Sequence, residues 1–181
     1  LFKWKDTEFS DLYISVNISP LDFYYIDVYT TLVDIVKKYD IDRHKLKLEI
    51  TETAIMSDVE KQILRVADLR NFGFTVEIDD FGAGYSSLAM LKDIEADVLK
   101  IDMSFLRETE HAERSRNVLA SIVQMADKLK MGTITEGVES INQVDMLNKM
   151  GCDRFQGFYF AKPMPVSEFE AFVRNNRADR G

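Results

Sequence analysis

The chain has 181 residues, 46% of them hydrophobic and 30% charged, which is enough for one globular domain with a full apolar core. Its net charge of −8 makes it a poor match for the phosphates of polymeric DNA or RNA. Cys152 is the single cysteine, so a disulfide framework is excluded. The sequence contains no apolar stretch close to the roughly 18 residues of a membrane span and no signal peptide, so we expect a cytoplasmic protein without direct membrane insertion.

The residue pattern switches repeatedly between the period of a strand and the period of a helix. In chain order, the predicted strand–helix units are Tyr13–Ser19 with Pro20–Tyr39, Leu46–Thr51 with Ser57–Phe72, Thr75–Asp80 with Ser86–Lys92, Val98–Asp102 with Ala112–Leu129, Thr133–Val138 with Ile141–Met150, and Arg154–Phe160 with Val166–Asn175. Alternation of this kind, with short links, predicts an α/β fold with a parallel sheet.

Several residues mark the ends of these predicted helices. Pro20 lies near the start of the first helix, and Ser57 is a candidate N-terminal cap for the second. We expect Gly73, Gly132 and Gly151 to end helices, because glycine readily adopts the left-handed conformation common at that position.

The faces of the predicted strands favour a barrel over an open sheet. Leu48 and Ile50 share one face of their strand, whereas Glu49 and Thr51 share the other, and three further strands alternate in the same way. An apolar face against helices and a polar face converging at the C-terminal mouth is typical of a (β/α)8 TIM-type barrel. Such a barrel needs about 250 residues and eight strands, so we expect residues 1–181 to be a single barrel domain that lacks its first strands.

Two adjacent aspartates, Asp79 and Asp80, interrupt an apolar strand just before a glycine-containing turn. Paired carboxylates at such a position are unfavourable unless cations neutralise them, so the pair indicates a metal site. The alternative is that Asp80 caps the next helix while Asp79 is solvated at the rim.

Further polar residues lie at the other strand ends and would meet the two aspartates there. This set consists of Asn17, Glu49, Glu52, Asp79, Asp80, Lys100, Asp102, Glu136, Glu139 and Gln156. The only histidines are His44, in a polar link, and His111, at the start of a charged stretch, so both are expected to be solvated and a zinc site is improbable. Carboxylate and amide oxygens suit Mg²⁺ or Mn²⁺. Two such cations could clamp a phosphodiester and activate a water molecule.

Lys100 lies at an inward position among these acids. It could orient the attacking water, or take its proton if the site depresses the pKa of the lysine. The structural alternative is a Lys–Asp ion pair in the barrel mouth. Asn17, the segment from Glu136 to Glu139, and Gln156 likewise have ordinary turn, loop and capping interpretations.

Six segments of the chain carry a resemblance to one protein family. They are Ser15-Val16-Asn17-Ile18-Ser19-Pro20, Leu48-Glu49-Ile50-Thr51-Glu52, Asp79-Asp80-Phe81-Gly82-Ala83-Gly84-Tyr85-Ser86-Ser87-Leu88, Leu99-Lys100-Ile101-Asp102, Glu136-Gly137-Val138-Glu139 and Gln156-Gly157-Phe158-Tyr159-Phe160-Ala161-Lys162-Pro163. In this order they resemble the EAL domain, the phosphodiesterase that opens the bacterial messenger cyclic di-GMP into linear pGpG.

The resemblance implies a barrel whose first strand is antiparallel, together with a role for each matching residue. The ligands of two Mg²⁺ or Mn²⁺ ions would be Asn17, Glu49, Asp79, Asp80 and Glu136. Lys100 would activate or orient the water, Glu139 and Gln156 would give supporting hydrogen bonds, and Glu52 would anchor the loop Asp80–Leu88. That loop touches the dimer interface in the family, so a homodimer is expected, and the parent protein could carry a GGDEF or sensor domain, or a membrane anchor.

The chain departs from the family pattern at several positions. The Glu-Ala-Leu segment that names the family, with its metal-binding glutamate, has no match in residues 1–181. Met103 stands where arginine is usual, Thr135 where alanine is usual, and Ala83 where threonine is common. A catalytically inactive cyclic di-GMP receptor or interaction module is therefore the alternative function, and an aldolase- or enolase-type metal-dependent barrel is a third. The retained Lys100 and paired aspartates favour the enzyme.

Overall fold

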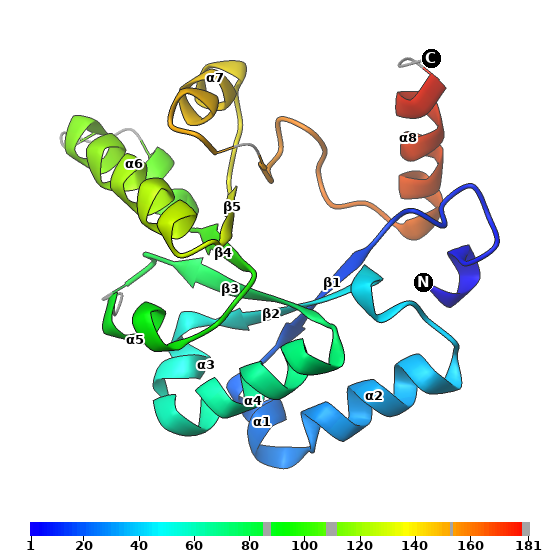
Figure 1. Ribbon diagram of the computed structural model, residues 1–181. Helices are drawn as coiled ribbons and strands as arrows, with labels where there is room; N and C mark the ends of the chain where they lie inside the picture. The colour runs from blue at the N-terminus through cyan, green and yellow to red at the C-terminus, as the bar shows by residue number, and fades with distance from the viewer. Residues whose placement is uncertain (85–87, 108–111, 153, 179–181) are drawn as a thin grey trace.

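The strands form one parallel sheet whose spatial order follows the sequence. A computed structural model describes residues 1–84, 88–107, 112–152 and 154–178. In this part of the chain the strands are β1 (Ile14–Ile18), β2 (Leu46–Thr51), β3 (Thr75–Phe81), β4 (Val98–Ile101) and β5 (Gly132–Thr135). All neighbouring pairs are parallel, so the C-terminal ends of the strands meet at one edge of the sheet (Figure 1).

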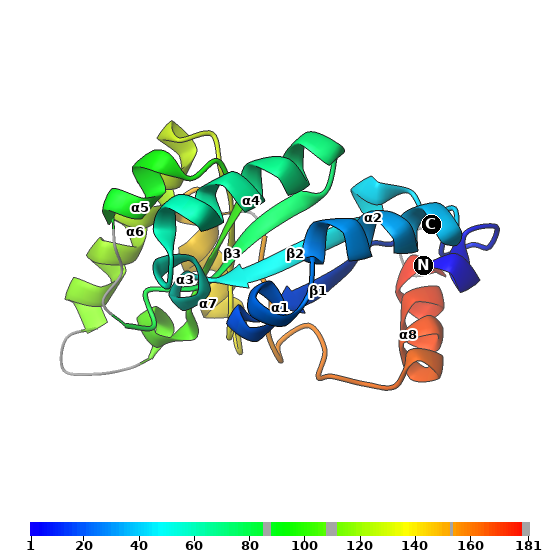
Figure 2. The ribbon, with the colours of Figure 1, turned by 90° about the horizontal axis from the view of Figure 1, so that it is seen from below.

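Helices connect the strands and cover the outer face of the sheet, except for the last helix, which follows the final strand. They are α1 (Pro20–Tyr25), α2 (Val28–Lys38), α3 (Glu52–Met56), α4 (Val59–Phe72), α5 (Leu88–Asp93), α6 (Ala112–Lys128), α7 (Ile141–Lys149) and α8 (Val166–Ala178), with short 3-10 turns at Phe2–Trp4, Arg43–Lys45 and Met103–Leu106. Figure 2 shows α2 and α4 side by side along β2 and β3. This repeating strand–helix order is that of a β/α barrel left open between β1 and β5.

The core lies between this outer face and the helices. Leu48, Ile50, Ile78, Leu99 and Ile101 are each 0% exposed, as the alternation of apolar and polar residues predicted. They form one cluster with buried residues of the surrounding helices. The polar residues between them therefore point to the opposite, inner face of the sheet.

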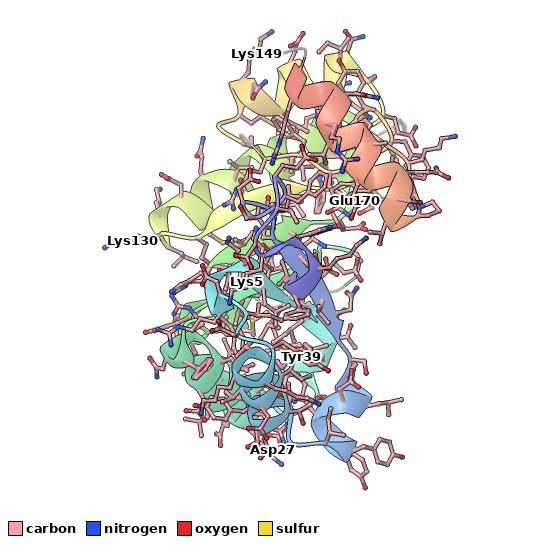
Figure 3. All side chains as sticks on the ribbon, turned by 90° about the vertical axis from the view of Figure 1, so that its right-hand side faces the viewer. Lys5, Asp27, Tyr39, Lys130, Lys149 and Glu170 are labelled. Carbon is pink, nitrogen blue, oxygen red and sulfur yellow. The ribbon has the colours of Figure 1, made fainter. Side chains whose placement is uncertain are left out.

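The last helix, α8, lies against the N-terminal segment rather than against the sheet (Figure 3). The Trp4 indole N–H donates to Glu170 at 2.7 Å, and the Trp4 and Phe169 rings lie 6.0 Å apart. Arg174 donates to Glu8 at 2.6 Å. These contacts tie together the two ends of the described chain.

Most predicted elements are confirmed, but one predicted helix is divided and another begins later than expected. The helix expected over Pro20–Tyr39 breaks at Ile26, whose backbone is extended, because Asp27 accepts a hydrogen bond from the Thr30 amide and starts α2. The helix expected over Ser57–Phe72 begins after Asp58 rather than at Ser57, and the separate helix α3 precedes it. Ser86, the expected start of the next helix, and His111 lie outside the described residues.

Two of the three glycine predictions hold, because Gly73 and Gly151 have φ values of +112° and +91° just after α4 and α7. Gly132, by contrast, is the first residue of β5, and α6 has already ended at Lys128. Cys152 is buried, and its sulfur lies 3.2 Å from the hydroxyl of Thr135. Thr135, one of the departures from the family pattern, therefore has a partner in the core.

The sixth predicted strand, Arg154–Phe160, is reduced to a single bridge between Thr135 and Phe155. The fifth strand also ends early, because Gly137 turns the chain with a φ of +68°. Beyond the bridge, Gly157 crosses the backbone of Val138 so closely that a Cβ there would lie 2.1 Å from the Val138 carbonyl oxygen. The Val138 amide still donates to the Gln156 carbonyl and the Tyr159 amide to the Val138 carbonyl, but no regular strand forms in this described segment.

We therefore expect Gly157→Ala to destabilise the fold by about 2 kcal/mol, because the methyl group would overlap backbone atoms that have little freedom to move. Gly84→Ala is the matched control, since a Cβ on Gly84 meets open space and the change should stay within about 0.5 kcal/mol. Urea unfolding of both variants measures the difference, and equal midpoints would contradict the close crossing.

Candidate functional site

A buried lysine on the inner face of the sheet lies at the centre of a cluster of carboxylates. Lys100 Nζ lies 2.7 Å from Asp79 Oδ1, 2.9 Å from Glu136 Oε1 and 3.0 Å from Glu49 Oε1. Its side chain is 3% exposed. The acids come from β2, β3 and the segment after β5, so residues far apart in sequence converge on one ammonium group, as the strand-end pattern predicted.

The charge state of Lys100 follows from two opposing effects. Burial lowers its pKa, but hydrogen bonds with Asp79, Glu136 and Glu49 prevail, and the pKa lies above the ordinary lysine value. Among these carboxylates the side chain is therefore a cation. A general-base role would need surroundings that lower the pKa of Lys100, and these carboxylates raise it.

The adjacent aspartates both reach this cluster because the strand is distorted between them. Successive side chains normally point to opposite faces of a sheet. The register of β3 against β4 shifts between Ile78 and Phe81, and Asp80 has a φ of +56°. As a result, carboxylate oxygens of Asp79, Asp80 and Glu136 all lie within 4.8 Å of one another. The rim position considered for Asp79 is wrong, because this residue is 8% exposed and bound to Lys100.

The acids in this cluster are not fully compensated by Lys100. Burial, followed by the charges of Asp79 and Asp102, raises the pKa of Asp80. Burial also raises the pKa of Glu136, and the charges of Asp79 and Asp80 add to the effect against the opposing influence of Lys100. Three converging carboxylates with excess negative charge form a donor set that suits a hard divalent cation such as Mg²⁺ or Mn²⁺.

The remaining predicted residues surround this cluster without all touching it. Asn17 is exposed on the edge strand β1, directly beside Glu49 in the register of β1 and β2. Glu52 is buried in the first turn of α3, immediately after β2. Residues 85–87 of the loop that Glu52 was expected to anchor lie outside the described part of the chain.

A groove of about 540 Å³ opens beside the cluster and contains the other two predicted residues. Glu139 and Gln156 line it together with Asp80 and Glu136, and Phe158, Pro163, Met164 and Phe169 form an apolar wall. The groove is therefore lined by both acidic and apolar side chains. This combination suits a ligand that carries both phosphate, bound through cations, and a flat apolar ring system.

Sequence reasoning did not assign a role to three charged residues that the structure places here. Asp102 lines the groove, and its place at a predicted strand end was the signal in the sequence that could have found it. Lys47 and Glu77 form a second buried ion pair, with 3.1 Å between Lys47 Nζ and Glu77 Oε1. Strand alternation placed Glu77 on the inner face, but pairing it with Lys47 requires the register of β2 and β3.

Comparison with known proteins agrees with the folded arrangement. The family model described as "EAL domain" matches residues 1–163. The chain belongs to the EAL domain family. The protein named cyclic di-GMP phosphodiesterase NbdA of Pseudomonas aeruginosa is 39% identical over 134 residues, which cover 74% of this EAL chain and 17% of NbdA. The protein named bifunctional diguanylate cyclase/cyclic di-GMP phosphodiesterase MucR, of the same species, is 34% identical over 170 residues, 94% of this chain and 25% of MucR.

Solved structures show the same EAL architecture. A PaMucR phosphodiesterase structure in complex with c-di-GMP superposes with a TM-score of 0.85 and 32% identity, covering 93% of this chain and 73% of that one. Klebsiella pneumoniae BlrP1 in a manganese and cyclic di-GMP complex gives a TM-score of 0.76 at 28% identity, covering 83% of this chain and 39% of that one. The TIM-type barrel architecture is thereby confirmed. The chain spans only 17–25% of the length of the first curated relatives.

Within the described residues, none of the helices combines the length and apolar character needed to cross a membrane.

Proposed function

We propose that this EAL domain hydrolyses one phosphodiester bond of cyclic di-GMP and releases linear pGpG in a reaction that depends on two Mg²⁺ or Mn²⁺ ions. The observation that carries the proposal is Lys100 bound to three carboxylates within 3.0 Å, beside a groove lined by both acidic and apolar side chains. The relatives named as cyclic di-GMP phosphodiesterases support the same substrate.

The proposed cation ligands are the oxygens of Asn17, Glu49, Asp79, Asp80 and Glu136. Asp79 would be shared by both cations, because its carboxylate contacts Lys100 and lies close to the oxygens of Asp80 and Glu136. When bound, divalent cations would stabilise the negative charge that develops on the phosphate and make the attacking water more acidic. Residues outside this ligand set would position the attacking water and the substrate.

Lys100 would direct the water toward phosphorus with an ammonium proton that one of its three carboxylate partners gives up when that carboxylate binds a cation, because an ammonium group has only three donors and accepts no hydrogen bond. The water oxygen forms a bond to phosphorus, the bond from phosphorus to one ribose 3′ oxygen breaks, and the proton that water loses is balanced by protonation of that oxygen. Glu139 and Gln156 line the groove and would hold the substrate by hydrogen bonds. Glu52, buried behind the end of β2, would hold the loop 80–88.

Removing divalent cations tests the proposal directly. We expect the purified protein to convert cyclic di-GMP to pGpG with Mn²⁺ or Mg²⁺ and to lose about a thousandfold or more in rate when a chelator is added, because carboxylates alone repel the phosphate. Product formation is followed by chromatography, and re-addition of Mn²⁺ after chelation is the control. Full activity in chelator would contradict the metal-dependent mechanism.

Binding of cyclic di-GMP without turnover would identify a receptor instead of an enzyme.

The parent protein should be assayed beside residues 1–181, because the relatives extend far beyond the matched region. We propose that the parent carries further domains, for which MucR, named as both cyclase and phosphodiesterase, is the model. Homodimer formation stays a prediction from the resemblance.

A further inference from the structure

A second pair of buried charges lies on the inner face of the sheet, one row of side chains below the carboxylate cluster. The Lys47 and Glu77 side chains are 11% and 1% exposed, and Lys47 Nζ lies 3.1 Å from Glu77 Oε1. The other oxygen of Glu77 accepts a hydrogen bond from Ser15 at 3.4 Å. Two ions inside a protein are expensive to desolvate, so a pair at this depth calls for a physical explanation.

The register places the carboxylate of this pair beside the site. Glu77 of β3 is directly opposite Glu49 of β2, and Asp79 follows two residues later on the same face. Glu49 and Asp79 both contact Lys100. Like charges on directly opposed positions of neighbouring strands repel each other, so Glu77 adds negative potential where Glu49 and Asp79 would bind cations.

The ammonium of the pair lies on the side away from the site. Lys47 precedes Glu49 by two residues, and its Nζ lies 3.8 Å above the centre of the Tyr13 ring, just before the N-terminal end of β1. A cation over an aromatic face is held there by the charge distribution of the ring. The pair is therefore oriented, with Glu77 next to the cluster and Lys47 toward Tyr13.

We propose that Lys47 and Glu77 are positioning residues that set the divalent-cation affinity of the site, with Glu77 strengthening and Lys47 weakening it. The inference rests on the proposed metal-dependent function, and it concerns charges that lie outside the ligand set. A purely structural pair would behave differently, because removing either partner would then loosen the same packing and shift affinity in the same direction.

The test is the dissociation constant for Mn²⁺, measured on the purified protein from the electron paramagnetic resonance signal of the free ion. Glu77→Gln leaves the Lys47 cation uncompensated and should weaken Mn²⁺ binding about tenfold. Lys47→Met leaves the Glu77 anion uncompensated and should tighten binding several-fold, by roughly the same electrostatic reasoning. The double variant is neutral at both positions and should return to within about twofold of the original value.

A charge-swapped variant, Lys47→Glu with Glu77→Lys, keeps an ion pair but turns its positive end toward Glu49. We expect it to fold, as judged by its melting temperature in chelator, and to bind Mn²⁺ about tenfold more weakly. If the swapped variant keeps the original affinity, or if both single variants bind Mn²⁺ more weakly, the inference is overturned while the proposed function stands. If a single variant fails to fold, the swapped variant decides the question. If the unaltered protein does not bind Mn²⁺, the proposed function fails first and the inference fails with it.

Discussion

Asp79→Asn should lower the affinity for Mn²⁺ about a hundredfold and the rate of cyclic di-GMP hydrolysis about a thousandfold. The substitution keeps the shape of the side chain and removes one charge from the point where the oxygens of Asp79, Asp80 and Glu136 converge within 4.8 Å. Lys100 keeps Glu49 and Glu136 as partners, so the ammonium stays in place while the proposed bridging oxygen loses its charge. Mn²⁺ titration and product analysis measure the two effects separately.

Asp93→Asn is the matched control, because the Asp93 side chain is 52% exposed and pairs only with the exposed Lys92 among the described residues. It removes the same charge from the protein as a whole and should leave affinity and rate unchanged. Loss of both properties in the two variants alike would show that net charge, rather than position, is responsible. Unchanged Mn²⁺ affinity in Asp79→Asn would remove this residue from the ligand set.

The sheet could be predicted from the sequence because its signals are local. Alternation of apolar and polar residues marked the four strands from β1 to β4, and the same alternation separated their core-facing side chains from the inward-facing ones. The sixth strand was wrong for a reason that is not local. Its sequence is rich in aromatic residues, as strands often are. However, Gly157 lies so close to Val138 that a Cβ on Gly157 would be 2.1 Å from the Val138 carbonyl oxygen. That contact joins segments whose spacing no local pattern reveals.

The site was predictable to the extent that strand ends determine it. Glu49, Asp79, Lys100 and Glu136 meet because parallel strands bring their C-terminal ends to one edge of the sheet. The convergence of Asp80 depends on a backbone with positive φ, which aspartate adopts more readily than most residues but which no local sequence pattern marks at this position. The Lys47–Glu77 pair depends on register, which the sequence of either strand alone does not give.

Lys100→Met should have an effect opposite in kind to that of Asp79→Asn, because it removes the water-directing group and also a cation that competes for the carboxylates. We expect hydrolysis to fall about a hundredfold while Mn²⁺ affinity stays the same or rises. In chelator the variant should lose about 3 kcal/mol of stability, since Glu49, Asp79 and Glu136 lose their shared counter-charge in a site where their side chains are at most 18% exposed. Saturating Mn²⁺ should restore much of that loss, because it supplies the missing charge.

Lys92→Met controls for the substitution itself, since the Lys92 side chain is 78% exposed and should change neither unfolding nor turnover. Urea unfolding with and without Mn²⁺ separates the two roles of Lys100. A lysine that only balances charge would give a variant that is stable and fully active once Mn²⁺ is bound, whereas a lysine that directs the water leaves a metal-loaded, folded protein that remains slow. The second result is the one expected from an ammonium group held by three carboxylates from different strands at the mouth of this barrel.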